Sequence, residues 1–156
     1  MSGREAGLWK WLRIRVSDLG HFSRVESETS AGIPDVHFQV GTFDSVWDPL
    51  KPAQGWIELK ADRTQKEKYP FKATDKGLRD TQIRWMTEYL ENGGQNLLIC
   101  YALDNRVCIS VLNQETLRKF NLYSREQLIQ IADLVFPRTS SESVRAQAYQ
   151  IRKLFK

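Results

Sequence analysis

Two apolar runs that contain charged residues decide the expected fold: Gly32-Ile33-Pro34-Asp35-Val36-His37-Phe38 and Gly55-Trp56-Ile57-Glu58-Leu59-Lys60-Ala61. Residues i and i+2 of a strand point to the same face of its sheet, so Glu58 and Lys60 share a face. Ile57 and Leu59 then point the other way, into a core. Charged groups inside strands are costly unless something compensates them. A divalent cation shared by Asp35 and Glu58, with Lys60 beside it, would provide that compensation.

The size and composition of the chain fit one globular domain. It has 156 residues, of which 41% are hydrophobic and 27% are charged, which is enough for a single core. No apolar run approaches the roughly 20 residues of a membrane span. The N-terminal residues Met1-Ser2-Gly3-Arg4-Glu5 lack the apolar stretch of a signal peptide. We therefore expect no membrane contact and a cytoplasmic location.

The two cysteines are expected to be buried thiols. If residues 104–105 form a hairpin loop, Cys100 and Cys108 point to opposite sides of that hairpin. A disulfide is then not expected. The sequence has no CxxC motif and no cluster of histidines, so a zinc site is not expected either.

The spacing of apolar and turn residues predicts an α/β sandwich. The expected elements are a helix over 3–17, a short strand near 21–26, strands over 33–40 and 55–61, a helix over 78–92, a strand pair over 96–103 and 106–112, a short helix over 114–120, a helix after Ser124 with Gln127 in a capping box, and a helix over 140–155. The expected apolar stripes are Leu8, Trp9, Leu12 and Val16 on the first helix and Val144, Ala148, Ile151 and Phe155 on the last. This order is αβββαββ followed by C-terminal helices.

The residue types of the two runs suit the hydrolysis of a phosphodiester. Mg²⁺ prefers oxygen ligands and keeps several waters, so two carboxylates and one backbone carbonyl suffice to hold it. Asp35 and Glu58 supply the carboxylates, and the Leu59 carbonyl is the candidate third ligand. Lys60, a compact positive charge, can bind the scissile phosphate or position the attacking water. Mn²⁺ is the expected substitute for Mg²⁺, and no organic cofactor is expected.

A glutamine interrupts the apolar stripe of the helix over 78–92. Gln82 follows Leu78 by four residues and precedes Trp85 by three, so it lies within that stripe. A glutamine that faces a core needs partners for its amide group. Two interpretations stay open: Gln82 contacts the phosphate or a water at the metal, or it is a core glutamine whose amide is satisfied by the backbone.

The elements Gly32-Ile33-Pro34-Asp35, Ile57-Glu58-Leu59-Lys60 and Gln82 with Trp85 together resemble the PD-(D/E)XK nuclease superfamily. Within it, the chain is most similar to the VRR-NUC group, which includes small phage-encoded members and relatives of Holliday-junction resolvases. The resemblance covers roughly residues 5–112. It implies a restriction-endonuclease-like core over 1–112, with a mixed central sheet flanked by helices. Residues 113–156 would be a C-terminal helical extension packed on the same domain.

The resemblance also implies roles for individual residues. The catalytic residues would be Asp35, Glu58, Lys60 and Gln82. Members of the family commonly carry another acidic residue on the first helix, for which Glu5 is the best match. Glu26 is the alternative metal ligand. It follows Arg24, in a place where a basic and an acidic residue often occur in the family.

Basic residues gather between positions 62 and 79 and between 138 and 156, and the net charge of the chain is +4. This balance favours a polyanionic partner, although either segment alone is also typical of a solvated surface. The candidate DNA-binding residues are Arg24, Lys66, Lys68, Lys72, Arg79 and Arg84. Trp47 and Trp56 are candidates for base stacking or for packing between the hairpin and a helix.

The expected function is that of a Mg²⁺- or Mn²⁺-dependent DNA endonuclease. The small size and the resemblance favour branched DNA, such as junctions or flaps, cut by a homodimer with two sites. If a phage encodes the chain, its location would be the host cytoplasm. One alternative is a single-site nuclease that acts on single strands or nicks duplexes. Another is a non-catalytic DNA-binding or anti-defence module on a nuclease scaffold, against which the complete set of candidate catalytic residues argues.

Overall fold

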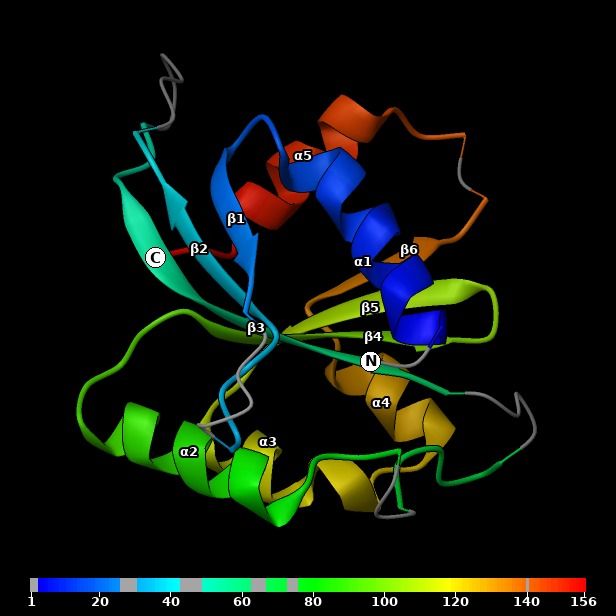
Figure 1. Ribbon diagram of the computed structural model, residues 1–156. Coiled ribbons are helices and arrows are strands. Elements are labelled where there is room, and N and C mark those ends of the chain that lie inside the picture. Colours follow the sequence, from blue (N-terminus) through cyan, green and yellow to red (C-terminus); the bar gives the residue numbers. More distant parts are fainter. Residues whose placement is uncertain (1–2, 26–30, 43–48, 63–66, 73–75, 140) are drawn as a thin grey trace.

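A mixed six-stranded sheet carries helices on both of its faces in the structure, a computed structural model (Figure 1). The structure describes residues 3–25, 31–42, 49–62, 67–72, 76–139 and 141–156. The strands are β1 (Gly20–Arg24), β2 (Val36–Val40), β3 (Ala53–Ala61), β4 (Leu97–Leu103), β5 (Arg106–Val111) and β6 (Leu134–Pro137). The helices are α1 (Gly3–Val16), α2 (Asp80–Glu91), α3 (Gln114–Lys119), the 3-10 helix η1 (Phe120–Leu122), α4 (Arg125–Ile131) and α5 (Val144–Arg152).

The order of strands in the sheet follows the order of the chain, β1-β2-β3-β4-β5-β6. Neighbouring strands pair antiparallel, except that β3 and β4 pair parallel. Antiparallel neighbours need only a short turn, whereas a parallel pair requires a crossover connection. The crossover from β3 to β4 contains α2, which lies across one face of the sheet (Figure 1).

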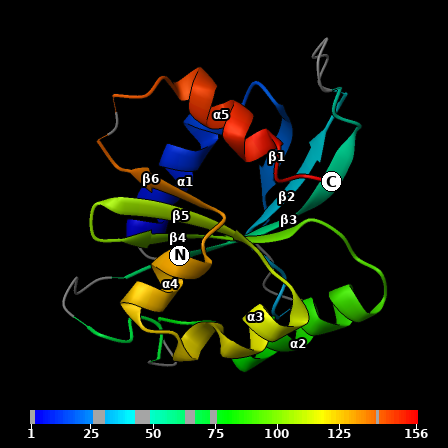
Figure 2. The same cartoon turned by 180° about the vertical axis from the view of Figure 1, so that it is seen from behind.

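The helices divide between the two faces of the sheet, as Figure 1 and the reverse view in Figure 2 show. Helices α1 and α5 pack together on one face, over a first core that includes Ile57 and Leu59. Helices α2, α3, η1 and α4 cover the other face, over a second core that includes Met86, Phe120 and Leu128. None of the helices in the described residues combines the length and apolar character that crossing a membrane requires.

Several sequence predictions are confirmed. The elements up to β5 follow the predicted order αβββαββ. The β4–β5 hairpin turns at residues 104–105, where Asp104 has a φ of 54°. Cys100 lies in the first core and Cys108 in the second, and both are buried free thiols. The two sulfurs therefore lie on opposite sides of the hairpin, because neighbouring strand positions alternate between the faces.

Three predictions near the two ends of the chain are wrong. Strand β6 was not expected, because a segment of four residues that ends in proline resembles a loop in the sequence. It is a strand because it pairs with β5. Helix α5 begins after the cap residue Ser143, so Val144 is exposed, and Phe155 enters the core beyond the end of the helix. On α1, Trp11 is buried in the core, while Trp9 packs at its margin.

Candidate active site

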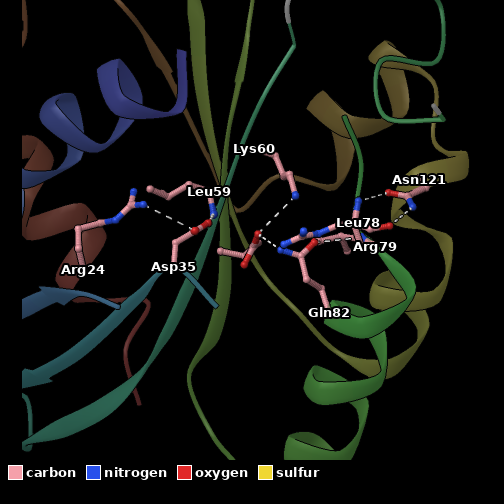
Figure 3. Close-up of polar contacts among 9 residues, drawn as sticks. Arg24, Asp35, Leu59, Lys60, Leu78, Arg79, Gln82 and Asn121 are labelled. Carbon is pink, nitrogen blue, oxygen red and sulfur yellow. Dashed lines mark hydrogen bonds and ion pairs between the residues drawn. The ribbon is translucent and has the colours of Figure 1, made fainter. Parts of the chain in front are cut away.

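The two candidate carboxylates lie where β2 stops pairing with β3: Asp35 directly precedes β2, which begins at Val36 and not at residue 33 as expected, and Glu58 lies in β3. The ladder ends with Val36 opposite Ile57. Pro34 then falls opposite Leu59 and, as a proline, has no N–H to donate to the Leu59 carbonyl. The Leu59 N–H donates to Asp35 Oδ2 at 2.9 Å (Figure 3). The Asp35 side chain thus takes the place of a ladder partner, which holds its carboxylate beside β3.

Glu58 and Lys60 lie on the face of β3 that α2 covers, and they are only 1% and 7% exposed. Lys60 Nζ lies 3.5 Å from Glu58 Oε1, and Gln82 Nε2 donates to the same oxygen at 2.7 Å. The other carboxylate oxygen, Glu58 Oε2, is buried and has no hydrogen-bond donor among the described residues. Because a buried charged oxygen without a donor is costly, Oε2 is the atom at which a positive partner would stabilise the site most.

Burial raises the pKa of Glu58 well above its usual value, and the negative charge of Asp35 raises it further, while Lys60 lowers it. The Asp35 side chain is 26% exposed. The pair is therefore open to solvent at Asp35 and closed at Glu58, and its two carboxyls compete for a proton or a cation.

Gln82 makes the backbone contact that the core interpretation predicts, together with a side-chain contact to Glu58 that neither interpretation named. Its Oε1 accepts from the backbone N–H of Arg79 at 3.0 Å, which is the helix-capping contact that a residue in this position of the first turn often makes. Its Nε2 donates to Glu58 (Figure 3). The backbone thus satisfies one end of the amide, and the other end orients the Glu58 carboxylate.

Gly32 allows the segment before β2 to lie against the first turn of α2. Its φ is 94°, in the left-handed region that favours glycine. A Cβ at this position would collide with the carbonyl of Thr81, the residue before Gln82. A larger residue at position 32 would therefore shift the segment before β2 relative to the first turn of α2, which carries Gln82.

An asparagine of η1, Asn121, holds the start of α2. Asn121 in η1 donates from Nδ2 to the Leu78 carbonyl at 2.8 Å and accepts at Oδ1 from the Leu78 N–H at 2.8 Å (Figure 3). Leu78 precedes Arg79, whose N–H holds Gln82. A connected series of contacts thus runs from Asn121 through the start of α2 to Glu58. The sequence analysis missed Asn121, which lies 43 positions from Leu78 and has no periodic relation to it.

The arginines expected to bind DNA lie near the carboxylates or on α2. Arg24 ends β1, and its guanidinium Nη2 lies 3.8 Å from Asp35 Oδ1. Arg24 thus forms an ion pair with the Asp35 carboxylate. Arg79 and Arg84 are exposed, at the N-cap and in the second turn of α2. These two side chains remain accessible to a phosphate backbone.

Two of the lysines expected to bind DNA, Lys68 and Lys72, lie on a segment that is anchored to the second core. Lys68 and Lys72 are exposed, and their ammonium groups lie 5.7 and 5.6 Å from the centroid of the Tyr69 ring. Phe71, between them, is fully buried. The backbone N–H of Arg125 donates to the Lys68 carbonyl at 2.8 Å. The two lysines are therefore presented to solvent by a backbone that is held at both the core and α4.

Three candidate residues lie outside the described residues: Glu26, Lys66 and Trp47. Glu5 lies in the first turn of α1 and is half-buried. The described part of the chain contains no group of three or more histidine, cysteine, aspartate or glutamate side chains placed to hold a metal ion. Glu5 therefore does not complete such a group with Asp35 and Glu58.

Comparison of the chain with protein-family models, with curated proteins and with solved structures gives no match. The functional assignment therefore depends on the chemistry of the arrangement itself. Two adjacent carboxyls, one half-buried and one buried, can bind a divalent cation. The buried ammonium of Lys60 beside them can bind or orient an anion.

Proposed function

We propose that the chain is a metal-dependent DNA endonuclease of the PD-(D/E)XK type, in which Asp35, Glu58 and Lys60 are catalytic and Gln82 assists. The observation that carries the proposal is the buried Glu58 carboxylate, whose Oε2 has no donor among the described residues although Asp35 lies beside it. A buried carboxylate with a purely structural role normally has its oxygens satisfied by donors. Asp35 and Glu58 instead place two carboxyl groups side by side, next to Lys60.

Mg²⁺, with Mn²⁺ as a substitute, fits the oxygens that this site offers. Asp35 and Glu58 would hold the cation together with the Leu59 carbonyl. In an antiparallel ladder the N–H and C=O of one residue face the same neighbour, so the Leu59 carbonyl faces the side on which its N–H meets Asp35. When bound, the cation supplies positive charge to the phosphate and lowers the pKa of water.

The residues around the cation would bind the phosphate groups of the DNA and orient the attacking water and the Glu58 carboxylate. Lys60, 3.5 Å from Glu58, is a compact charge that binds a phosphate oxygen or orients the attacking water. Gln82 donates to one oxygen of Glu58, which fixes the orientation of the carboxylate and leaves the other oxygen for the cation. Arg79 and Arg84, exposed on α2, contact the phosphates that flank the scissile bond.

The element order αβββαββ and the mixed sheet support a restriction-endonuclease-like core, and the motifs support the VRR-NUC group within it. We propose branched DNA as the substrate and a homodimer as the active form, because two sites related by a two-fold axis make paired cuts. Both assignments rest on the resemblance of the motifs.

The test is cleavage of labelled single-stranded, duplex, flap and four-way-junction DNA with Mg²⁺, Mn²⁺ or EDTA. We expect metal-dependent cutting by the wild type that Glu58→Ala and Asp35→Ala abolish while DNA binding persists. Glu115→Ala, which removes an exposed carboxylate on α3, is the matched control and should cut normally. Full activity of Glu58→Ala, or no cutting of any DNA by folded wild type, would contradict the proposal. A monomer at micromolar concentration, measured by light scattering, would contradict the homodimer.

A further inference from the structure

A row of aromatic side chains continues from the carboxylates along the same face of the sheet. His37 and Trp56 are opposite partners in β2 and β3, with ring centroids 4.7 Å apart. Trp56 lies edge to face with Trp85 of α2 at 5.4 Å, and Trp85 stacks on Tyr89 at 5.3 Å with 12° between the ring planes. All four rings are half-buried, so the row follows the seam between the sheet and α2 and remains partly open to solvent.

The row and the candidate active site are aligned because the periodicities of strand and helix bring them together. Trp56 precedes Glu58 by two residues on β3 and therefore lies on the same face. On α2, Trp85 and Tyr89 follow Gln82 by three and seven residues, which places them on the same side of the helix. The contact between Gln82 and Glu58 is thus followed along the seam by the contact between Trp85 and Trp56.

The row ends at an open pocket of about 700 Å³ beside the C-terminal end of α2. Polar uncharged side chains dominate its wall, which includes Gln39, Gln54, Tyr89, Gln95 and Asn96. Among the described residues that line the pocket, Lys156 is the one with a charged side chain. Gln39 Nε2 lies 3.5 Å from Gln54 Oε1, a long hydrogen bond that a ligand can readily replace.

The chemistry of the pocket suits an uncharged, planar group with donors and acceptors along its edge. The C-terminal end of a helix carries partial negative charge, which attracts N–H donors and disfavours a phosphate. Each glutamine amide offers both a donor and an acceptor, the combination that proteins use to read the edges of nucleobases. The neighbouring aromatic rings add contacts with a π face. A nucleobase has all of these properties.

We propose that this pocket, bounded by Gln39, Gln54 and Tyr89, binds an unpaired nucleobase of the DNA strand whose phosphate lies at Asp35 and Glu58. The proposal rests on the nuclease function above. Gln54 precedes Glu58 by four residues, or about 13 Å along the strand. Because a stacked strand advances about 3.4 Å per nucleotide, the base would lie roughly four nucleotides from the cut, and fewer if the strand is extended. A base that is paired and stacked in a duplex cannot enter the pocket, so the pocket selects DNA that is unpaired near the cut.

The test measures the dissociation constant by fluorescence anisotropy in EDTA, which prevents cutting. The probe is a labelled duplex with a single-stranded overhang, in which one nucleotide at a time is replaced by an abasic site. We expect the loss of one base, a few nucleotides from the junction, to weaken binding about tenfold, with small effects at other positions. The double variant Gln39→Ala/Gln54→Ala should bind the intact and abasic probes equally. Gln130→Ala, which removes an exposed amide on α4, should behave as the wild type.

The outcomes separate this proposal from the nuclease function. If the wild type cuts DNA with Mg²⁺ but no abasic position changes its affinity, the pocket proposal is overturned and the nuclease function stands. A double variant that keeps the wild-type loss at the same position also overturns the pocket proposal. If the wild type cuts no DNA but shows position-dependent binding that the two glutamines control, the pocket proposal is supported and the nuclease function is overturned.

Discussion

Replacing Glu58 by glutamine should stabilise the protein in the absence of divalent cations, and the gain should grow as the pH rises. The pKa of Glu58 in the folded protein is raised above the ordinary value of 4.5, chiefly by burial and then by the charge of Asp35. The folded state therefore holds this proton more tightly than the unfolded state does. The wild type loses stability as the pH rises from about 4.5 through the folded pKa, and the loss then levels off. Glutamine keeps the acceptor for Gln82 without the buried charge.

The size of the effect follows from the single proton involved. One proton changes the free energy of unfolding by at most about 1.4 kcal/mol per pH unit between the unfolded and folded pKa values. For a chain of this size, 1 kcal/mol moves Tm by about 2–4 °C. The Tm gap between Glu58→Gln and the wild type should therefore widen by at most roughly 3–5 °C per pH unit. Lys60 loses its carboxylate partner in the variant, which changes the Tm difference by a further amount. The prediction is therefore tested by how the Tm difference changes with pH and not by its absolute value.

The assay is thermal unfolding of both proteins in EDTA between about pH 5 and pH 8, with Tm as the readout. Glu115→Gln is the matched control. The pKa of Glu115 is lowered by its hydrogen bond to Lys119, so its contribution is complete above its ordinary pKa and its gap to the wild type should stay flat in this range. Added Mg²⁺ should narrow the Glu58→Gln gap by stabilising the wild type. A gap that does not change with pH would refute the reasoning, because it would mean that Glu58 is no harder to ionise in the folded state.

Two further variants test how the start of α2 is positioned. Asn121→Ala removes both hydrogen bonds to Leu78 and should lower the free energy of unfolding by about 1–3 kcal/mol in urea; it should also slow DNA cleavage more than it weakens DNA binding, and equal loss of both would argue against a positioning role. Gly32→Ala adds strain and a collision with the Thr81 carbonyl, so it should cost roughly 2–4 kcal/mol. Gly93→Ala has a similar φ of 83° but open space around it, and a cost as large as that of Gly32→Ala would contradict the close approach.

Local periodicity explains why much of the fold was predictable. Glu58 and Lys60 share one face of β3, and Ile57 and Leu59 share the other, because alternation is a property of the strand itself. The capping box at Ser124 is equally local, and both of its hydrogen bonds form. Strand β6 was missed because its few residues become a strand only through pairing with β5. Edge strands of this kind have no independent signal in the sequence.

The residue types of the candidate site were readable from the chain, since Asp35, Glu58 and Lys60 are charged residues in or beside apolar strands. Gln82 was also a candidate because it interrupts an apolar stripe, but its hydrogen bond to Glu58 was not predicted, and Asn121 was missed. Gln82 lies 24 positions from Glu58, and the contact depends on how α2 packs across the sheet after Gly32 lets it approach. Asn121 reaches α2 from a separate helix. Periodicity relates residues within one element, whereas the distance between elements is set by packing and by the loops that join them. Three-dimensional packing therefore selected the side chains that complete the site.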